Sequence, residues 1–532
     1  MRKKFLKITL AVITLITLTL NMVVVNAEPP ELPSGEAPSG NETTLGNGGP
    51  NGSETPPEKP DGDGNSQGGI PGGDAVGGSS SASYTGATTI SSDTTESGTS
   101  YSSTTGGENA LLVDGGTAIL SEITVTKSGD SSGDNADFYG TNAAVLAYNG
   151  ATLNIEGGTI TTNGSHANAV FAYGEGIINI AKTTIKTSSN NSGAVMVTGG
   201  GTLTATDVTA TTDGNSSAPI RSDKGGGTLT VNGGTYTSNG VGSPAIYSTA
   251  EIIVNNATLT STASEGAVVE GANSIELNNV TLTDTNTSLN GNSETYKNIF
   301  LYQSMSGDAD VGNASFTAKD SKITTNKGDT IFVTNTTATI SLENNEIINN
   351  DESGAFIRIQ SGKWGTSGSN GGNVTLTAKN QVIEGDIYVD NISTLDMTLA
   401  NNSEYIGTIN AENTAKNLSI TLDSTSTLTL MGDSYISELN NAVSDNSNIN
   451  LNGYTLYVGD EAITATNYNE NLDNASVSDA DSNVNKKSES DSEDESDSTK
   501  LITVIALAVG LVIVCGAAIV IAMKKNKVDK DK

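Results

Sequence analysis

The chain has 532 residues, a formal net charge of −34 and only 4% aromatic residues. Nucleic acids and anionic membrane surfaces repel so acidic a chain, which argues against a nucleic-acid partner. One cysteine and one histidine exclude an internal disulfide framework and any cysteine- or histidine-rich metal site.

Residues 1–27 have the composition of a secretory signal peptide. Basic residues open the segment, an apolar stretch follows, and Val25-Asn26-Ala27 offers a cleavage site. Cleavage after Ala27 is expected, and an uncleaved membrane anchor is the alternative.

Residues 28–83 hold nine of the eleven prolines and lack apolar periodicity, so a disordered segment is expected. Within it, residues 61–65 (DGDGN) resemble the start of an EF-hand calcium loop. The closing position holds Gly72 instead of glutamate, which favours an acidic linker. No cofactor is expected, and any Ca²⁺ binding, here or in the Asp- and Asn-containing turns, is expected to be weak.

Residues 84–460 repeat one pattern of three short strands and three turns. Each block opens on an apolar segment such as AVLAY, AVFAY or AVMVT, and two alternating segments and a turn rich in Gly, Asn and Ser follow. The blocks are spaced by 25 residues from Val145 to Ile220 and lengthen to about 30 residues later in the chain. A fixed period of this length, without helical periodicity, predicts a solenoid built from strands.

The predicted fold is therefore all-β: a single right-handed parallel β-helix of about 13 coils over residues 84–460. In this respect the chain resembles the pectate-lyase-like β-helix family, and within it the adhesin-like surface proteins of bacteria. The closing stretch TLTLMGDSYISELNNAVSDNSNINLNGYTLYVGD is similar to the ends of such proteins. An array of immunoglobulin-like sandwiches is the alternative, but those domains need about 100 residues each.

The segment 225–240, GGGTLTVNGGTYTSNG, represents the repeat. Its glycines could belong to a phosphate-binding loop, but they lead into an alternating strand and not a helix. We expect the glycines to turn corners that need a positive φ, and Leu229 and Val231 to lie in the core.

The opening strands predict two ladders, because alternate side chains of a strand point to opposite faces. The inward ladder is Val145, Val170, Val195, Ile220, Ile246, Val268, Ile299, Ile331, Ile357 and Ile387. The outward neighbours are Leu146, Phe171, Met196, Arg221, Tyr247, Val269, Phe300, Phe332, Arg358 and Tyr388, with Tyr148, Tyr173 and Tyr302 two positions further on.

The outward aromatic and arginine side chains are the candidate ligand-binding residues, since such a row suits sugar rings or a partner protein. The candidates are Tyr148, Phe171, Tyr173, Arg221, Tyr247, Phe300, Phe332, Arg358 and Tyr388. Turn insertions that cover the row, or a reversal of the two faces, are the alternatives.

Catalytic motifs of β-helix lyases and hydrolases are not recognisable, so an enzyme is not expected. The body has two arginines, Arg221 and Arg358, and neither lies in a recurring acidic cluster; Arg358-Ile359-Gln360 only partly matches the Arg-Ile-Lys of galacturonase-like hydrolases. The one histidine, His166, falls in the turn GSHAN, where an exposed surface histidine is expected.

The C-terminal segments predict a membrane tether. Residues 461–500 form an acidic Ser/Asp-rich stalk, and residues 501–523 are an uncharged stretch long enough to span a bilayer. Residues 524–532 form a basic tail, which the positive-inside rule places in the cytoplasm.

The expected function is that of a single-pass cell-surface protein, resembling bacterial adhesins, whose β-helix lies outside the membrane and binds a polysaccharide or a surface protein. A polysaccharide lyase or hydrolase is the second hypothesis. A structural surface protein without a specific ligand is the third.

Overall fold

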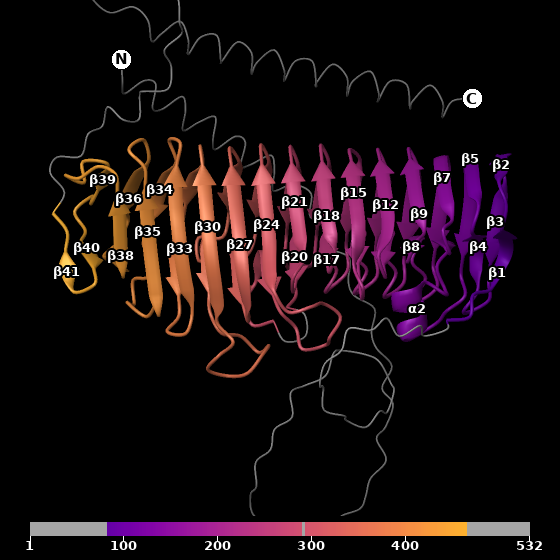
Figure 1. The fold of residues 1–532 in the computed structure, drawn as a ribbon, viewed down its shortest axis with the longest axis horizontal. Helices are drawn as coiled ribbons and strands as arrows, with labels where there is room; N and C mark the ends of the chain where they lie inside the picture. The colour runs from indigo at the N-terminus through magenta and orange to yellow at the C-terminus, as the bar shows by residue number, and fades with distance from the viewer. Residues whose placement is uncertain (1–81, 290–292, 465–532) are drawn as a thin grey trace, which may run out of the picture. The chain divides into compact units, whose positions relative to one another are not determined.

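The computed structural model describes residues 82–289 and 293–464. They form a right-handed parallel β-helix of about 15 turns, with a single short helix in the described part, α2 (Asp134–Tyr139) (Figure 1). The predicted fold is confirmed. The predicted signal peptide, the stalk from residue 465 onward, the membrane span and the tail lie outside the described residues. Among the described residues, no helix is long and apolar enough to cross a membrane.

The predicted count of 13 coils was too low. Blocks near the C-terminus shorten instead of lengthening: Ile387 pairs with Ile409, and Ser434 pairs with Leu456, so each of these coils takes only 22 residues. Spacing drawn from the longer blocks before them therefore undercounts the turns.

The first twelve coils each contribute one strand to a first face, in which all neighbours pair in parallel. The first-face strands are β1 (Gly86–Ile90), β4 (Asn109–Asp114), β6 (Val145–Tyr148), β8 (Val170–Tyr173), β11 (Val195–Thr198), β14 (Ile220–Ser222), β17 (Ile246–Ser248), β20 (Ala267–Glu270), β23 (Lys297–Tyr302), β26 (Asp329–Thr334), β29 (Ile357–Ile359) and β32 (Ile387–Val389).

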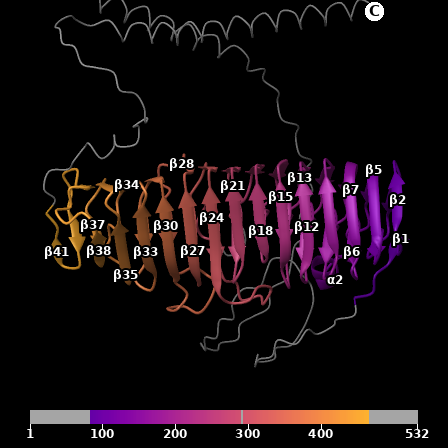
Figure 2. The same cartoon turned by 45° about the horizontal axis from the view of Figure 1, so that its top comes forward.

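The second face follows in each coil, and Figure 2 shows its strands stacked along the helix axis. Its strands are β2 (Thr94–Ser97), the first half of β5 (Thr117–Lys127), the first half of β7 (Thr152–Thr162), β9 (Ile177–Ala181), β12 (Gly201–Thr206), β15 (Gly227–Asn232), β18 (Glu251–Asn255), β21 (Ser274–Asn278), β24 (Asn313–Lys319), β27 (Thr336–Glu343), β30 (Gly372–Lys379), β33 (Thr394–Ala400), β35 (Asn417–Leu422) and β38 (Glu438–Asn441).

The third face closes each coil. Its strands are β3 (Ser100–Ser103), the second halves of β5 and β7, β10 (Thr184–Thr187), β13 (Thr209–Thr212), β16 (Thr235–Ser238), β19 (Thr258–Ser261), β22 (Thr281–Asp284), β25 (Lys322–Thr325), β28 (Glu346–Asn349), β31 (Val382–Glu384), β34 (Glu404–Gly407), β36 (Thr427–Leu430) and β39 (Ile449–Asn450). The last coils add β37 (Ser434–Ile436), β40 (Leu456–Val458) and β41 (Glu461–Ala462), and β41 alone pairs antiparallel.

In most coils, one or two residues with positive φ make the corner between the second and third faces. Asparagine and aspartate dominate this position, and their side chains bond from coil to coil: Asn279 Nδ2 donates to Asn256 Oδ1 at 2.8 Å. Asn344 Nδ2 likewise donates to Asp320 Oδ1 at 2.7 Å. Gly233 holds the same position with φ 74°, so the predicted role of glycine is confirmed but is shared with asparagine.

The inward ladder forms the core, and its predicted members are fully buried apart from Val268. In that coil Ala267 pairs with Ile246 and with Ile299, so Ala267 lies inside and Val268 faces outward. This coil is shorter than its neighbours, and a one-residue change of register reverses the direction of every side chain. Leu229 and Val231 are fully buried as predicted.

A second interior column carries polar groups at the ends of the third-face strands. Thr187, Thr212, Ser238 and Ser261 stack in register and are fully buried. Asp284 continues the column where the neighbouring coils have hydroxyl groups. Burial raises the pKa of the Asp284 carboxyl to about 8, although backbone N–H groups of Asn326 and Asn286 oppose the shift.

Asp284 makes stability depend on pH. Its folded pKa lies above its value in the unfolded chain, so its contribution is complete below about pH 4 and is lost as the pH rises towards 8. Asp284→Ser restores the hydroxyl column and should raise the urea midpoint at pH 9 relative to the parent protein. The corresponding increase in the free energy of unfolding should be a few kcal/mol, since each unit of pKa shift is worth about 1.4 kcal/mol.

Asp310→Ser is the matched control, because Asp310 is exposed. The control should follow the parent protein at every pH. A parent protein and an Asp284→Ser variant with parallel pH profiles would contradict a neutral, buried Asp284.

Candidate functional site

The outward row of the first face is a single register position. Met196 pairs with Phe171 and Arg221, Arg221 pairs with Tyr247, and Phe332 pairs with Phe300 and Arg358. The predicted grouping is thus confirmed except in one coil, where Val268 takes the place predicted for Val269. In the coil after Tyr388, the buried Asn410 takes this position, because Ile387 pairs with Ile409. The two coils beyond it hold Tyr435 and Tyr457, which pair with one another.

The prediction that this row faces solvent is wrong for its N-terminal part. Leu146, Phe171 and Met196 point away from the interior of the coil, yet they are fully buried. They belong to an apolar cluster outside the β-helix core. Gly140, which ends α2, lies directly against Phe171 and Leu146, so α2, near β8 in Figure 1, forms the first cover of the row. Thr198 Oγ1 donates a hydrogen bond of 2.6 Å to the carbonyl of Phe138 in α2.

His166 connects α2, the first cover, to the coils of the β-helix. Its Nδ1 lies 2.7 Å from Asp137 of α2, and its Nε2 lies 3.1 Å from Asn191 Nδ2 in the next coil. His166 has a φ of 54° and stacks below Asn191 in a turn of the same conformation. The predicted exposed histidine is therefore a partly buried anchor, with a side chain that is 14% exposed.

Tyr148 and Tyr173 are half-buried in an aromatic cluster at the N-terminal end. The ring centroids of Tyr84 and Tyr148 lie 4.3 Å apart, and those of Tyr139 and Tyr173 lie 5.5 Å apart. Burial, with help from Asp114, raises the pKa of Tyr148 to about 12. Both tyrosines remain partly exposed to solvent, so their role in ligand binding stays a prediction.

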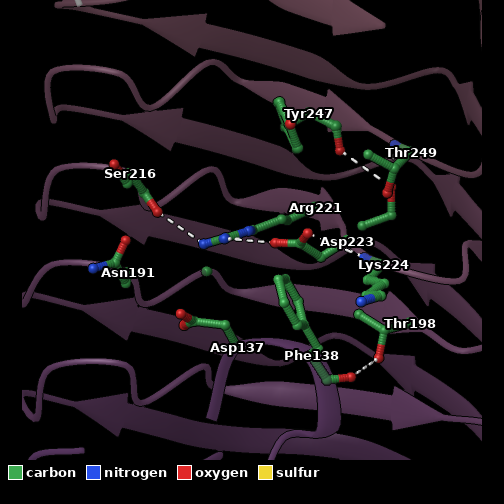
Figure 3. Close-up of polar contacts among 12 residues, drawn as sticks. Asp137, Phe138, Asn191, Thr198, Ser216, Arg221, Asp223, Lys224, Tyr247 and Thr249 are labelled. Atoms are coloured by element: carbon green, nitrogen blue, oxygen red, sulfur yellow. Dashed lines mark hydrogen bonds and ion pairs between the residues drawn. The ribbon is translucent and has the colours of Figure 1, made fainter. Parts of the chain in front are cut away.

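Arg221 lies just beyond the first cover and is only 8% exposed (Figure 3). Its guanidinium pairs with Asp223 at 2.9 Å and donates to the carbonyl of Ser216 at 2.8 Å. Burial alone would lower the pKa of Arg221, but the carboxylates of Asp223 and Asp137 outweigh burial and raise it. The prediction of an exposed arginine is wrong, because these groups enclose the guanidinium.

A second cover lies over the middle of the row. Trp364, in the loop of residues 360–371, packs on Phe300 and Tyr302 with centroid distances of 5.5 and 5.2 Å. Phe300 and Phe332 are 4% and 5% exposed, so the expectation that they face solvent is also wrong. Insertions between strands cover the row, which is the alternative that the sequence left open.

A line of alternating charges runs beneath this second cover. Lys297 lies 3.3 Å from Glu265, and its Nζ sits 4.4 Å from the ring centre of Phe300. In the next coils, Arg358 pairs with Asp329 at 2.7 Å. Burial lowers the pKa of Lys297, and Glu265 opposes that shift. Removing one partner of such a buried pair costs about 3–5 kcal/mol, because the other charge is left buried and unpaired.

Glu270 accepts hydrogen bonds from several side chains around the row, and the sequence alone did not predict a role for it. It is 1% exposed and accepts hydrogen bonds from Tyr247, from Tyr302 at 2.8 Å and from Ser304. Burial and this carboxylate raise the pKa of both tyrosines well above the usual value. The half-buried Tyr247 therefore has its hydroxyl committed to Glu270.

Apart from the half-buried Tyr247, the row opens near the C-terminus. Arg358 and Tyr388 are half-buried, and the Arg358 guanidinium lies 4.3 Å from the centre of the Tyr388 ring. Tyr435 and Tyr457 are also half-buried and stack with centroids 4.8 Å apart and ring planes at 5°. The sequence did carry a signal for this pair, since SYI and LYV repeat the pattern of IYV in β32. We call Arg358, Tyr388, Tyr435 and Tyr457 the open end.

Comparisons with known proteins identify no relative, so any inference about function starts from the fold. No protein-family model matches the chain, and searches of curated proteins and of solved structures return no significant match. Across the described ranges, no group of three or more His, Cys, Asp or Glu side chains is placed to hold a metal ion.

His166→Asn should release the first cover. Asparagine keeps the positive φ of the turn but does not reach Asp137 as the imidazole does, so α2 loses this side-chain contact. Amide hydrogen exchange in residues 134–139 should accelerate at least severalfold, while exchange in β8 changes little.

Ser165→Ala changes the neighbouring residue of the same turn and is the control. It should leave exchange in α2 at the rate of the parent protein. Equal exchange in the His166→Asn variant and the parent protein would show that His166 does not hold the cover.

Proposed function

We propose that this protein is a membrane-tethered surface protein, resembling bacterial adhesins, that binds a glycan through the open end of its β-helix. The proposal rests on a contrast along one register position: Phe171, Phe300 and Phe332 are buried, whereas Tyr388, Tyr435 and Tyr457 are half-buried. Flat tyrosine faces with a polar hydroxyl at the edge suit stacking on sugar rings.

The spacing of the open end supports an extended ligand. Tyr388 and Arg358 occupy adjacent coils, as do Tyr435 and Tyr457, and adjacent strands lie about 4.8 Å apart. A chain of sugars that runs along the shaft would therefore meet Arg358 and Tyr388 in adjacent coils, and Tyr435 and Tyr457 beyond the coil of the buried Asn410. Weak contacts of this kind add up when several are made together.

The proposed membrane tether is inferred from the sequence alone, since residues 1–27 and 501–523 lie outside the described part of the chain. A secreted, C-terminally anchored β-helix on an acidic stalk would hold the open end nearer to the membrane than the first cover. A binding partner of such a protein is a polysaccharide or a protein at the cell surface.

A polysaccharide lyase or hydrolase remains the second candidate, and the described residues give it less support. Both arginines of the body are held in ion pairs with Asp223 and Asp329, so neither is free to act as a base. A shallow depression of about 350 Å³ on the second face has Glu156 as the one carboxylate among its lining residues, and glycoside hydrolysis needs two.

The double variant Tyr435→Ala/Tyr457→Ala tests the glycan proposal. Binding to the best glycan on an array of plant, host and bacterial polysaccharides should weaken about tenfold, because each stacked ring contributes about 0.5–1.5 kcal/mol. Release of reducing ends or of unsaturated sugars from the same polysaccharides would favour the enzyme instead.

Tyr454→Ala is the matched control, since Tyr454 is 42% exposed and precedes the strand that holds Tyr457. It should bind as the parent protein does. Phe171→Ala is unsuitable as a binding test, because it empties a buried position and would act on stability. Unchanged affinity in the double variant would remove the open end as the glycan site.

A further inference from the structure

The third face carries threonines at one outward position over seven consecutive coils. The series is Thr124, Thr159, Thr184, Thr209, Thr235, Thr258 and Thr281, and every neighbour pairs directly with the next. All seven residues are exposed. No coil slips in register, so these side chains form a straight column along the shaft.

A second column lies two residues further along the same strands. Thr211, Thr237, Thr260 and Thr283 are its uninterrupted part, again in register. Adjacent coils repeat at about 4.8 Å and residues two apart along a strand at about 6.6 Å, so the two columns form a flat rectangular array. We call this array the threonine lattice.

Strand propensity alone does not explain the threonine lattice. The second face is built from equally regular strands, and one of its outward columns reads Ile119, Asn154, Asn179, Thr204, Thr230, Ile253 and Glu276. A preference for β-branched residues would act on both faces alike. The third face differs in having one residue type at one position.

The threonine lattice is also uncharged in a strongly acidic protein. From Thr209 to Thr283, its two columns hold only threonine, although the chain has 60 acidic residues. At the N-terminal side, Lys186 interrupts the second column and pairs with Asp213 at 3.5 Å. A charged or aromatic ligand therefore finds no complementary group on this surface.

The hydroxyl groups of the threonine lattice make no side-chain hydrogen bond to any of the described residues. Outward side chains on the second face behave differently: Asn179 Nδ2 donates to Asn154 Oδ1 at 3.0 Å, and Ser121 Oγ to Ser97 Oγ at 2.8 Å. Threonine is stiff at χ1 in a strand, so its hydroxyl and methyl groups stand in a fixed pattern. The array thus offers ordered hydroxyl groups to the solvent.

We propose that the threonine lattice binds ordered water at the surface of ice. Ordinary ice presents a regular array of oxygen atoms on its faces, and these atoms donate and accept hydrogen bonds as the threonine hydroxyl groups do. A rigid, flat and uncharged surface of alternating hydroxyl and methyl groups matches such a solid, whereas a crystalline polysaccharide is better held by aromatic faces. The site lies on a different face from the open end and does not depend on the glycan proposal.

The test compares the purified full-length protein with variants in a partially frozen solution. The parent protein should be enriched in the ice fraction relative to serum albumin and should slow the recrystallisation of ice. Thr209→Tyr/Thr235→Tyr places two bulky rings in the lattice, and we expect it to lose both effects. Thr204→Tyr/Thr230→Tyr makes the same changes in the same coils on the second face, and it should retain both.

Thermal unfolding of the three proteins shows whether each variant keeps its fold. If the third-face substitutions unfold the chain, Thr209→Val/Thr235→Val takes their place, since valine keeps the shape of threonine and removes the hydroxyl. Absence of the parent protein from the ice fraction would overturn the proposal. Equal loss in both tyrosine variants would also overturn it, as would binding to crystalline cellulose through the same threonines without enrichment in ice.

Discussion

In-register stacking of parallel strands is the constraint on which the rest of this structure depends. Each coil must return to the same place above the last, and most coils make the corner between the second and third faces with a residue of positive φ. Asparagine, aspartate and glycine supply that conformation, and asparagine amides bond from coil to coil at the corner. The same stacking places equivalent residues of successive coils in one row, so a residue type that recurs at one position gives the whole row its chemical character.

This constraint explains why rows of like residues arise on every face. An inward row becomes the aliphatic core, and an outward row becomes a surface with one chemical character. The outward row of the first face is too apolar to remain exposed, and insertions between strands cover it. α2 covers Phe171, and Trp364 covers Phe300, while buried charge pairs such as Glu265 with Lys297 hold adjacent coils together.

The sequence was sufficient to predict the fold, because strand alternation and a fixed period specify the coil. It also identified which side chains point outward, as Met196 and Arg221 illustrate. It could not show exposure, since burial of Phe171 depends on a six-residue helix whose own pattern is too short to read. The partners of Arg221 and His166 come from other coils or from α2, and only the fold brings them together. Tyr435 and Tyr457 were recoverable from their strand pattern but lie in short coils that the repeat spacing did not count.

Hydroxyl-radical footprinting of the intact protein tests the central claim most directly, namely that the outward row is covered at its phenylalanines and open at its C-terminal end. Tyr435 and Tyr457 should be oxidised much faster than Phe171, Phe300 and Phe332, despite the common register of these side chains. Similar oxidation rates along the whole row would contradict the two covers and, with them, the placing of the contact surface at the open end.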